Sequence, residues 1–101
     1  MTQPGSAGFR VTRNDEASRF EGRLDGELVA IADFVETGRS LTMTHTEVLP
    51  AHENQGLATT LVDAAFRDAR ERGLRIVPAC SFVRLHARRH AEDFADVLAP
   101  R

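Results

Sequence analysis

The turn within Val48–Thr59 is the part of the chain best suited to bind a ligand. Strand-like residues end there, and helical spacing begins at Leu57. Gly56 permits a tight backbone turn, and the N–H groups from Asn54 onward would lack carbonyl partners in a first helical turn. Amides at the positive end of a helix dipole can bind an anion, above all a phosphate. A helix that merely begins at a glycine has the same pattern, so both interpretations stay open.

Two side chains just before this turn are suited to moving protons. His45 and Glu47 are two residues apart, so an extended backbone points both to the same side of a sheet. A neutral imidazole has an ordinary pKa of about 6.5 and can take a proton from an amine, with the carboxylate as its partner. The alternative is a hydrogen-bonded histidine at the centre of a strand beside a solvated or capping acid.

Cys80 is the only cysteine, and it directly precedes a predicted helix. A helix N-terminus lowers the pKa of a thiol and increases its thiolate character. Cys80 is therefore a candidate nucleophile, a residue that lines a pocket, or a buried apolar side chain. The four histidines and the cysteine have no spacing typical of a metal site, so we expect no metal.

Hydrophobic spacing predicts the elements that must position these residues. Period-two alternation and turn residues predict strands over 9–14, 18–24, 27–36, 40–49 and 75–79, and period-3.6 spacing predicts helices over 57–72 and 81–90. The first four strands are expected to be antiparallel, and the crossover through a helix makes the last one parallel to its predecessor. The predicted fold class is α+β (mixed α/β), a mainly antiparallel sheet with one parallel strand pair and two helices packed on it.

Local patterns add detail to this fold. One face of strand 40–49 is expected to carry Leu41, Met43, His45, Glu47 and Leu49, and the other face its threonines and Val48. Ser81 is the expected N-cap of the second helix. The residues expected to close the core after that helix are Phe94, Val97 and Leu98. We expect residues 1–8 to form a flexible N-terminus and residues 9–101 a single domain.

The composition is that of an ordinary globular protein, with 42% hydrophobic and 28% charged residues among 101. A net charge of −2 gives no bulk attraction to nucleic acid or to acidic membranes, so neither partner is expected. All thirteen basic residues are arginine, which excludes lysine-based catalysis. We find no signal peptide and no run of about 20 apolar residues, and we expect a cytoplasmic protein.

Three motifs occur in order along the chain: His45-Thr46-Glu47-Val48, then Gln55-Gly56-Leu57-Ala58, then Ala69-Arg70-x-x-Gly73-Leu74-Arg75-Ile76-Val77-Pro78-x-Cys80-x-Phe82-Val83. Together they resemble the GNAT acetyltransferase superfamily and, more narrowly, its short YjdJ-like, NATD-type branch. The resemblance extends from about Phe20 to Val97. Glu53 stands where the wider superfamily has glutamine or arginine, which puts a side-chain contact to phosphate in doubt but leaves the backbone amides.

The resemblance implies that the chain binds acetyl-CoA, with the pyrophosphate at the turn and the pantetheine arm between strands 40–49 and 75–79. The implied cofactor-binding residues are Val48, Leu49, Asn54, Gln55, Gly56, Leu57, Ala58, Thr59 and Cys80. The thioester would lie close to His45, Glu47 and Cys80, the candidate catalytic residues. His86 stands where many relatives have a tyrosine that protonates the departing thiolate. It either does the same in this tyrosine-free chain or is a polar residue on the outer helix face, in which case the thiolate leaves unassisted.

The implied function is N-acetylation of an amine by direct attack in a ternary complex, with His45, or water held by Glu47, as the base. Only Asp15–Ser18 separates the first two strands, where other members have two helices, so the acceptor side is expected to be open. An open groove fits a protein or peptide amine, or the partner subunit of a homodimer. The alternatives are a CoA-binding or partner-docking module with little or no catalysis, and a small structural domain.

Overall fold

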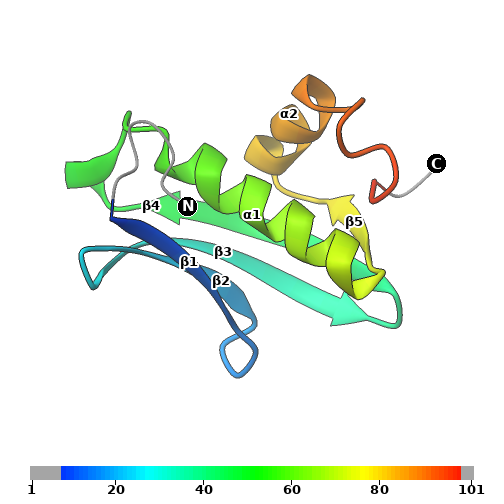
Figure 1. The fold of residues 1–101 in the computed structure, drawn as a ribbon, viewed down its shortest axis with the longest axis horizontal. Helices are drawn as coiled ribbons and strands as arrows, with labels where there is room; N and C mark the ends of the chain where they lie inside the picture. Colours follow the sequence, from blue (N-terminus) through cyan, green and yellow to red (C-terminus); the bar gives the residue numbers. More distant parts are fainter. Residues whose placement is uncertain (1–7, 99–101) are drawn as a thin grey trace.

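Four antiparallel strands, a helix, a fifth strand parallel to the fourth and a second helix make up residues 8–98, the part of the chain that the computed structural model describes (Figure 1). The elements are β1 (Phe9–Asn14), β2 (Arg19–Leu24), β3 (Glu27–Thr37), β4 (Ser40–Val48), a 3-10 turn (Pro50–His52), α1 (Leu57–Arg72), β5 (Arg75–Pro78) and α2 (Ser81–Arg89). The strands lie in the sheet in their sequence order, and β4 and β5 form its parallel pair. The predicted fold class is confirmed.

Local chemistry sets the ends of these elements. Asp25 and Gly26 have φ angles of 51° and 91°, the left-handed conformations that a two-residue hairpin between β2 and β3 requires. Helix α1 has the predicted bounds and ends at Gly73, whose N–H bonds back to carbonyls of the last turn. The other predicted bounds hold to within one residue. Residues 1–7 of the predicted flexible N-terminus lie outside the described residues, and the carbonyl of Gly8 accepts a hydrogen bond from Asp25.

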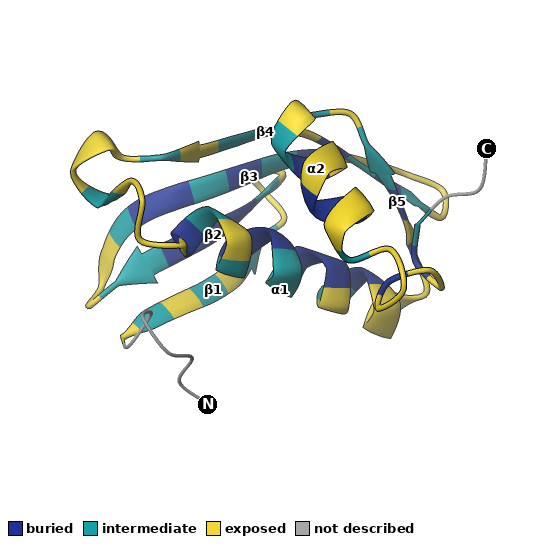
Figure 2. Ribbon diagram, turned by 90° about the horizontal axis from the view of Figure 1, so that it is seen from above, coloured by how far each residue is buried: buried dark blue, intermediate teal, exposed yellow. Residues whose placement is uncertain are grey.

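Both helices cover the same face of the sheet, and the core lies beneath them (Figures 1 and 2). Helix α1 contacts all five strands, and α2 packs against α1, β4 and β5. Under α1 lie the buried side chains of Phe20, Ala32, Phe34, Leu41 and Met43. As predicted, Phe94 and Val97 close the core, and Leu98 bridges Ile76 of β5. Among residues 8–98, no helix packs on the other face of the sheet, and none is long and apolar enough to span a membrane.

A β-bulge in β4 overturns the predicted division of its two faces. Asp33 of β3 pairs with His45, but the next residue of β3 pairs with Met43, so Thr44 is an extra residue in β4. Because one inserted residue reverses the side-chain alternation, Met43 points into the core while His45 points to the uncovered face. The expectation that these two side chains share one face is therefore wrong. Beyond the bulge, the side chains of Thr46 and Val48 point toward the helices.

The parallel pairing between β4 and β5 is short and ends in a gap. It runs from Ser40 opposite Arg75 to Met43 opposite Pro78, and the N–H of Ala79 then donates to the carbonyl of Met43 at 3.0 Å. Strand β4 continues to Val48 without β5 as a partner. The chain turns away at Cys80, which occupies the N-cap position of α2 with an extended backbone, so the prediction of Ser81 at this position is wrong. Helix α2 therefore begins at Ser81, one residue earlier than a cap at Ser81 would allow.

Candidate functional site

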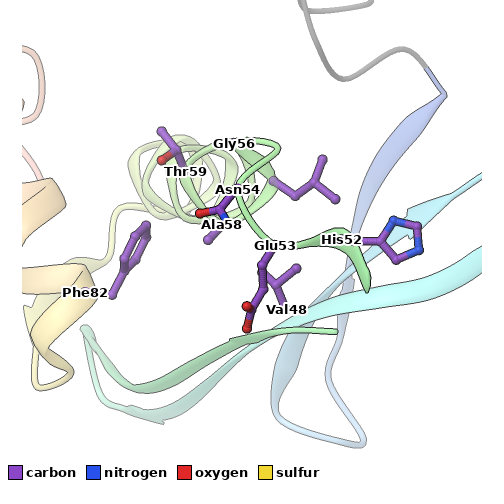
Figure 3. A pocket seen from close by; sticks show the side chains of 9 residues that line it. Val48, His52, Glu53, Asn54, Gly56, Ala58, Thr59 and Phe82 are labelled. Atoms are coloured by element: carbon purple, nitrogen blue, oxygen red, sulfur yellow. The ribbon is translucent and has the colours of Figure 1, made fainter. Parts of the chain in front are cut away.

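A pocket of about 430 Å³ lies at the start of α1, beside the gap between β4 and β5 (Figure 3). Side chains from β4, the connecting turn, α1 and α2 surround it. The lining residues are Val48, His52, Glu53, Asn54, Gly56, Leu57, Ala58, Thr59 and Phe82. Its size falls within the range of small-molecule and cofactor sites.

The backbone at this pocket is arranged to bind an anion. Asn54 and Gly56 both have left-handed φ angles, 67° and 77°, which turn the chain sharply into α1. The first intrahelical hydrogen bond runs from the N–H of Thr60 to the carbonyl of Gly56 at 3.1 Å. The amides from Gly56 to Thr59 therefore donate to no acceptor within residues 8–98. The first turn of α1 has no acidic residue, so its dipole is not compensated there.

The pocket contains six of the nine residues expected at the cofactor: Val48, Asn54, Gly56, Leu57, Ala58 and Thr59. Gln55, which is exposed, and Cys80 are not among the lining residues. Leu49 lines a second pocket on the opposite face of the sheet. Sequence reasoning missed His52 and Phe82 as lining residues. The position of Phe82, two residues after Cys80 in the first turn of α2, is the signal that points to it.

His45 and Glu47 lie together on the uncovered face. The Nε2 atom of His45 is 3.2 Å from the Oε1 atom of Glu47, and both side chains are more than half exposed. The tautomer that donates from Nε2 to Glu47 has its lone pair on Nδ1, which can then accept a proton. The arrangement can therefore work as a base with an orienting carboxylate.

Cys80 lies on the other side of β4, half-buried at the start of α2. Its Sγ atom is 3.7 Å from the Oγ1 atom of Thr46. Burial alone raises the pKa of the thiol, but hydrogen bonds from the backbone of Val83 and Phe82 and from Thr46 outweigh it, so the pKa is lowered. The structure thus places Cys80 on the helix side of β4 and the pair of His45 and Glu47 on its open side.

The structure turns His86 away from this pocket. The ring is 4% exposed between α1 and α2, so it does not lie on an outer helix face. Its Nε2 atom is 3.4 Å from Oδ1 of Asp63, and the ring packs edge-on to Phe66. Burial, and then the neighbouring His90, lower the pKa of His86, and Asp63 opposes only part of this effect. A neutral imidazole therefore fits this position best.

Glu53 lines the same pocket as the first residues of α1, and its side chain lies beside Val48 (Figure 3). Its charge weakens the attraction for a phosphate. Within residues 8–98, no group of three histidine, cysteine or carboxylate side chains is arranged to hold a metal ion.

Three solved structures share the fold of this chain. The ribosomal-protein-S18-alanine N-acetyltransferase of Escherichia coli is 22% identical with a TM-score of 0.55, over 57% of this chain and 38% of its own. The ribosomal-protein-alanine N-acetyltransferase of Brucella melitensis biovar Abortus 2308 is 24% identical with a TM-score of 0.58, over 82% of this chain and 64% of its own. Ard1 of Thermoplasma volcanium is 19% identical with a TM-score of 0.51, over 56% of this chain and 39% of its own.

The chain thus spans less than two thirds of the length of each of these proteins. No match was found among curated proteins. A sequence model of the GCN5-related N-acetyl-transferase family matches residues 19–97, most of the chain. The narrower assignment to the YjdJ-like, NATD-type branch stays a prediction. The family model, the shared fold and the amides at the start of α1 agree, and the chain belongs to the GCN5-related N-acetyltransferase family.

Proposed function

We propose that this protein binds acetyl-CoA in the pocket at the start of α1 and transfers the acetyl group to an amine. The observation that supports this best is the row of amides from Gly56 to Thr59, which have no acceptor within residues 8–98 and line a pocket of about 430 Å³. A diphosphate has the charge and the acceptor oxygens that such amides bind. The residues present therefore fit the cosubstrate.

The free edge of β4 is suited to the pantetheine arm. The N–H of Leu49 donates to the carbonyl of Val29 on the β3 side at 2.9 Å. Backbone groups alternate along a strand, so those of Thr46 and Val48 face the opposite edge, toward the gap beside α2. The amides of the arm can pair with that edge as an added strand does. Phe82 then forms the wall on the α2 side.

Acetyl-CoA supplies an acetyl group activated as a thioester. The amine nitrogen attacks the carbonyl carbon from the open face, a C–N bond forms, and the C–S bond breaks with departure of the thiolate. The proton lost by the nitrogen goes to Nδ1 of His45, whose ring Glu47 orients at 3.2 Å. Cys80 and Thr46 line the sulfur end of the gap. We assign His86 a role in packing α2 onto α1, and the thiolate takes its proton from water.

A CoA-binding module with little catalysis is the second candidate. The observation that favours it is the large exposure of both His45 and Glu47, which leaves the base in water. The two functions differ in turnover, because only an enzyme releases free thiol from acetyl-CoA when an amine is added. The predicted cytoplasmic location and homodimer stay predictions.

Thermal unfolding in the presence of acetyl-CoA tests the shared step, which is binding. A ligand of the native state at about 100 times its Kd adds about 2.7 kcal/mol to the free energy of unfolding. Gly56→Val forces a side chain onto a left-handed residue at the pocket and should abolish the shift. Gly38→Val is the matched control, because Gly38 is also left-handed with open space around it but lies in the β3–β4 turn. An undiminished shift in Gly56→Val would contradict the proposed site.

A further inference from the structure

A second pocket of about 180 Å³ lies on the sheet face that no described helix covers. Its lining residues come from β2, β3 and the end of β4: Arg19, Leu28, Val29, Ala30, Ile31, Glu47 and Leu49. It adjoins the first pocket across β4, because Val48 lines one and its neighbours Glu47 and Leu49 line the other. A molecule bound here is thus next to Glu47 and its partner His45. The volume is below the range of drug-sized ligands, so a bound molecule must be small.

Most of this pocket is apolar. Val29 and Ala30 are buried, and Leu28 and Ile31 are half-buried around them. Leu49 is a large side chain that remains 40% exposed at the edge. Burying such surface against an apolar group is favourable because it removes the surface from water. The pocket therefore fits a small aliphatic side chain.

Two opposite charges border the apolar part from the two sides of β3. Ile31 pairs with Glu47 of β4 on one side and with Glu21 of β2 on the other, and Arg19 follows along β2. Glu47 can hold an ammonium group, and the guanidinium of Arg19 can hold a carboxylate. A ligand that carries both charges close to an aliphatic group matches this distribution.

Arg19 retains positive charge although it has a carboxylate partner. Its Nε atom donates to Glu21 at 2.8 Å, and Glu21 also accepts from Arg23 at 2.8 Å and from Asn14 at 3.0 Å. Two guanidinium groups share one carboxylate, so the cluster carries a net charge of +1. Among the described residues, Glu21 is the only acid paired with Arg19, and that contact is through Nε. The network orients Arg19 and leaves its terminal nitrogens for a second anion.

We infer that the acceptor amine is a free aliphatic amino acid, bound in this second pocket with its ammonium group at Glu47 and its carboxylate at Arg19. The inference rests on the proposed acetyl transfer and names its substrate class. In the reaction the ammonium group gives one proton to Nδ1 of His45, and its nitrogen forms the C–N bond to the acetyl carbonyl. The C–S bond breaks, the amide nitrogen loses its second proton to solvent, and the thiolate leaves with its electron pair.

L-leucine and L-leucinamide form the matched substrate pair for a thiol-release assay with acetyl-CoA. Leucinamide has the same side chain and a less basic amine, so intrinsic reactivity favours it at neutral pH. The pocket instead predicts that kcat/KM for leucine exceeds that for leucinamide by about tenfold or more, because a charged hydrogen bond is lost with the amide. Equal or better use of leucinamide, or of a peptide N-terminus, would overturn the inference.

Arg19→Gln should raise KM for leucine about tenfold and leave KM for leucinamide nearly unchanged. Arg10→Gln removes the same charge from the adjoining strand β1, at a residue that neither lines the pocket nor contacts Glu21, and should change neither constant. Thermal unfolding with acetyl-CoA shows whether each variant still folds and binds its cosubstrate. An unchanged preference for leucine in Arg19→Gln would contradict the assigned role.

A binding measurement keeps the inference testable if no amine is acetylated. With CoA present, L-leucine added to ¹⁵N-labelled protein should shift the NMR signals of Leu28, Ile31 and Leu49, and Arg19→Gln should weaken this binding. CoA binding without any leucine-dependent shift would refute the amino-acid site while leaving the cosubstrate site intact. Failure to bind CoA would instead refute the proposed function.

Discussion

The Sγ atom of Cys80 lies 3.7 Å from the Oγ1 atom of Thr46, just beyond the point where β4 and β5 cease to pair. Thr46 projects toward the helices, whereas its neighbours His45 and Glu47 project to the open face. A thioester bound in this gap, as proposed, would have a thiol and a hydroxyl on one side and an imidazole on the other. Point substitutions can separate the contributions of the two sides.

Replacing Thr46 with valine removes one of the hydrogen bonds that lower the pKa of the Cys80 thiol. We expect slower alkylation of Cys80 by iodoacetamide at about pH 7–8, measured by mass spectrometry, because the thiolate is the reactive form. Thr44→Val alters an exposed hydroxyl on the same strand and should leave the rate unchanged. If Thr46→Val reacts as fast as wild type, the hydroxyl of Thr46 does not contribute to the lowered pKa of Cys80.

Replacing His45 with glutamine should lower kcat for acetyl transfer by about 100-fold or more, the usual contribution of a general base. Glu47→Gln should have a smaller effect, because it removes the orienting carboxylate and leaves the imidazole. Steady-state thiol release measures both. The stabilisation by acetyl-CoA should persist in each variant, since neither side chain lines the first pocket. A kcat unaffected by His45→Gln would mean that another group accepts the proton.

Helix α1 shows how much of this fold the sequence predicts. Its apolar period and the flanking Gly56 and Gly73 specify Leu57–Arg72, and the structure has the same bounds. The extra residue Thr44 could not be predicted, because a bulge depends on register with β3 and leaves the run of alternating residues in the sequence intact. That one residue moves His45 to the open face.

Only the part of the candidate site that is formed by neighbouring residues in the sequence is predictable from the sequence. The amides after Gly56 follow from a glycine before a helix, so residues 56–59 are predictable from the sequence, whereas His52 of the preceding turn is not. Phe82 lines the same pocket through the packing of α2, and Arg19 enters the second pocket from β2. Such contacts between segments distant in the sequence have no local signature. The burial of His86 likewise depends on contact with Phe66 of α1.

Replacing Glu53 with glutamine should tighten acetyl-CoA binding. The carboxylate lines the same pocket as the helix amides, and its removal relieves repulsion of the diphosphate. A charge near a helix terminus contributes about 0.3–1 kcal/mol, so Kd should fall by about two- to fivefold in isothermal titration at low salt. Glu71→Gln makes the same change near the other end of α1 and should leave Kd unchanged. Weaker binding in Glu53→Gln would show that the carboxylate helps to hold the ligand.

Burial, and then the neighbouring His90, lower the pKa of His86, so the folded protein binds its proton less readily than the unfolded chain does. The unfolded value is about 6.5. The contribution of neutral His86 to the free energy of unfolding is therefore fully present above about pH 6.5. It is lost as the pH falls toward the lower pKa of the folded state. Urea unfolding at about pH 7 and pH 5.5 should show this loss in wild type and less of it in His86→Leu.

The pH experiment needs to distinguish His86 from other titrating groups. Hydrogen bonds from Arg23, Arg19 and Asn14 lower the pKa of Glu21 to about 2, so its effect on stability begins only below the ordinary glutamate value, outside the tested range. His45→Leu removes an exposed histidine and should keep the wild-type pH dependence. The same loss of stability in His86→Leu as in wild type would assign the effect to another group.

A crystal structure of the protein with CoA would show whether the amides at the start of α1 hold the cosubstrate. We expect the diphosphate oxygens at about 2.7–3.2 Å from the backbone nitrogens of Gly56 to Thr59, with the pantetheine arm along the free edge of β4. Diphosphate bound elsewhere, with these nitrogens contacting only water, would show that the proposed binding site is wrong.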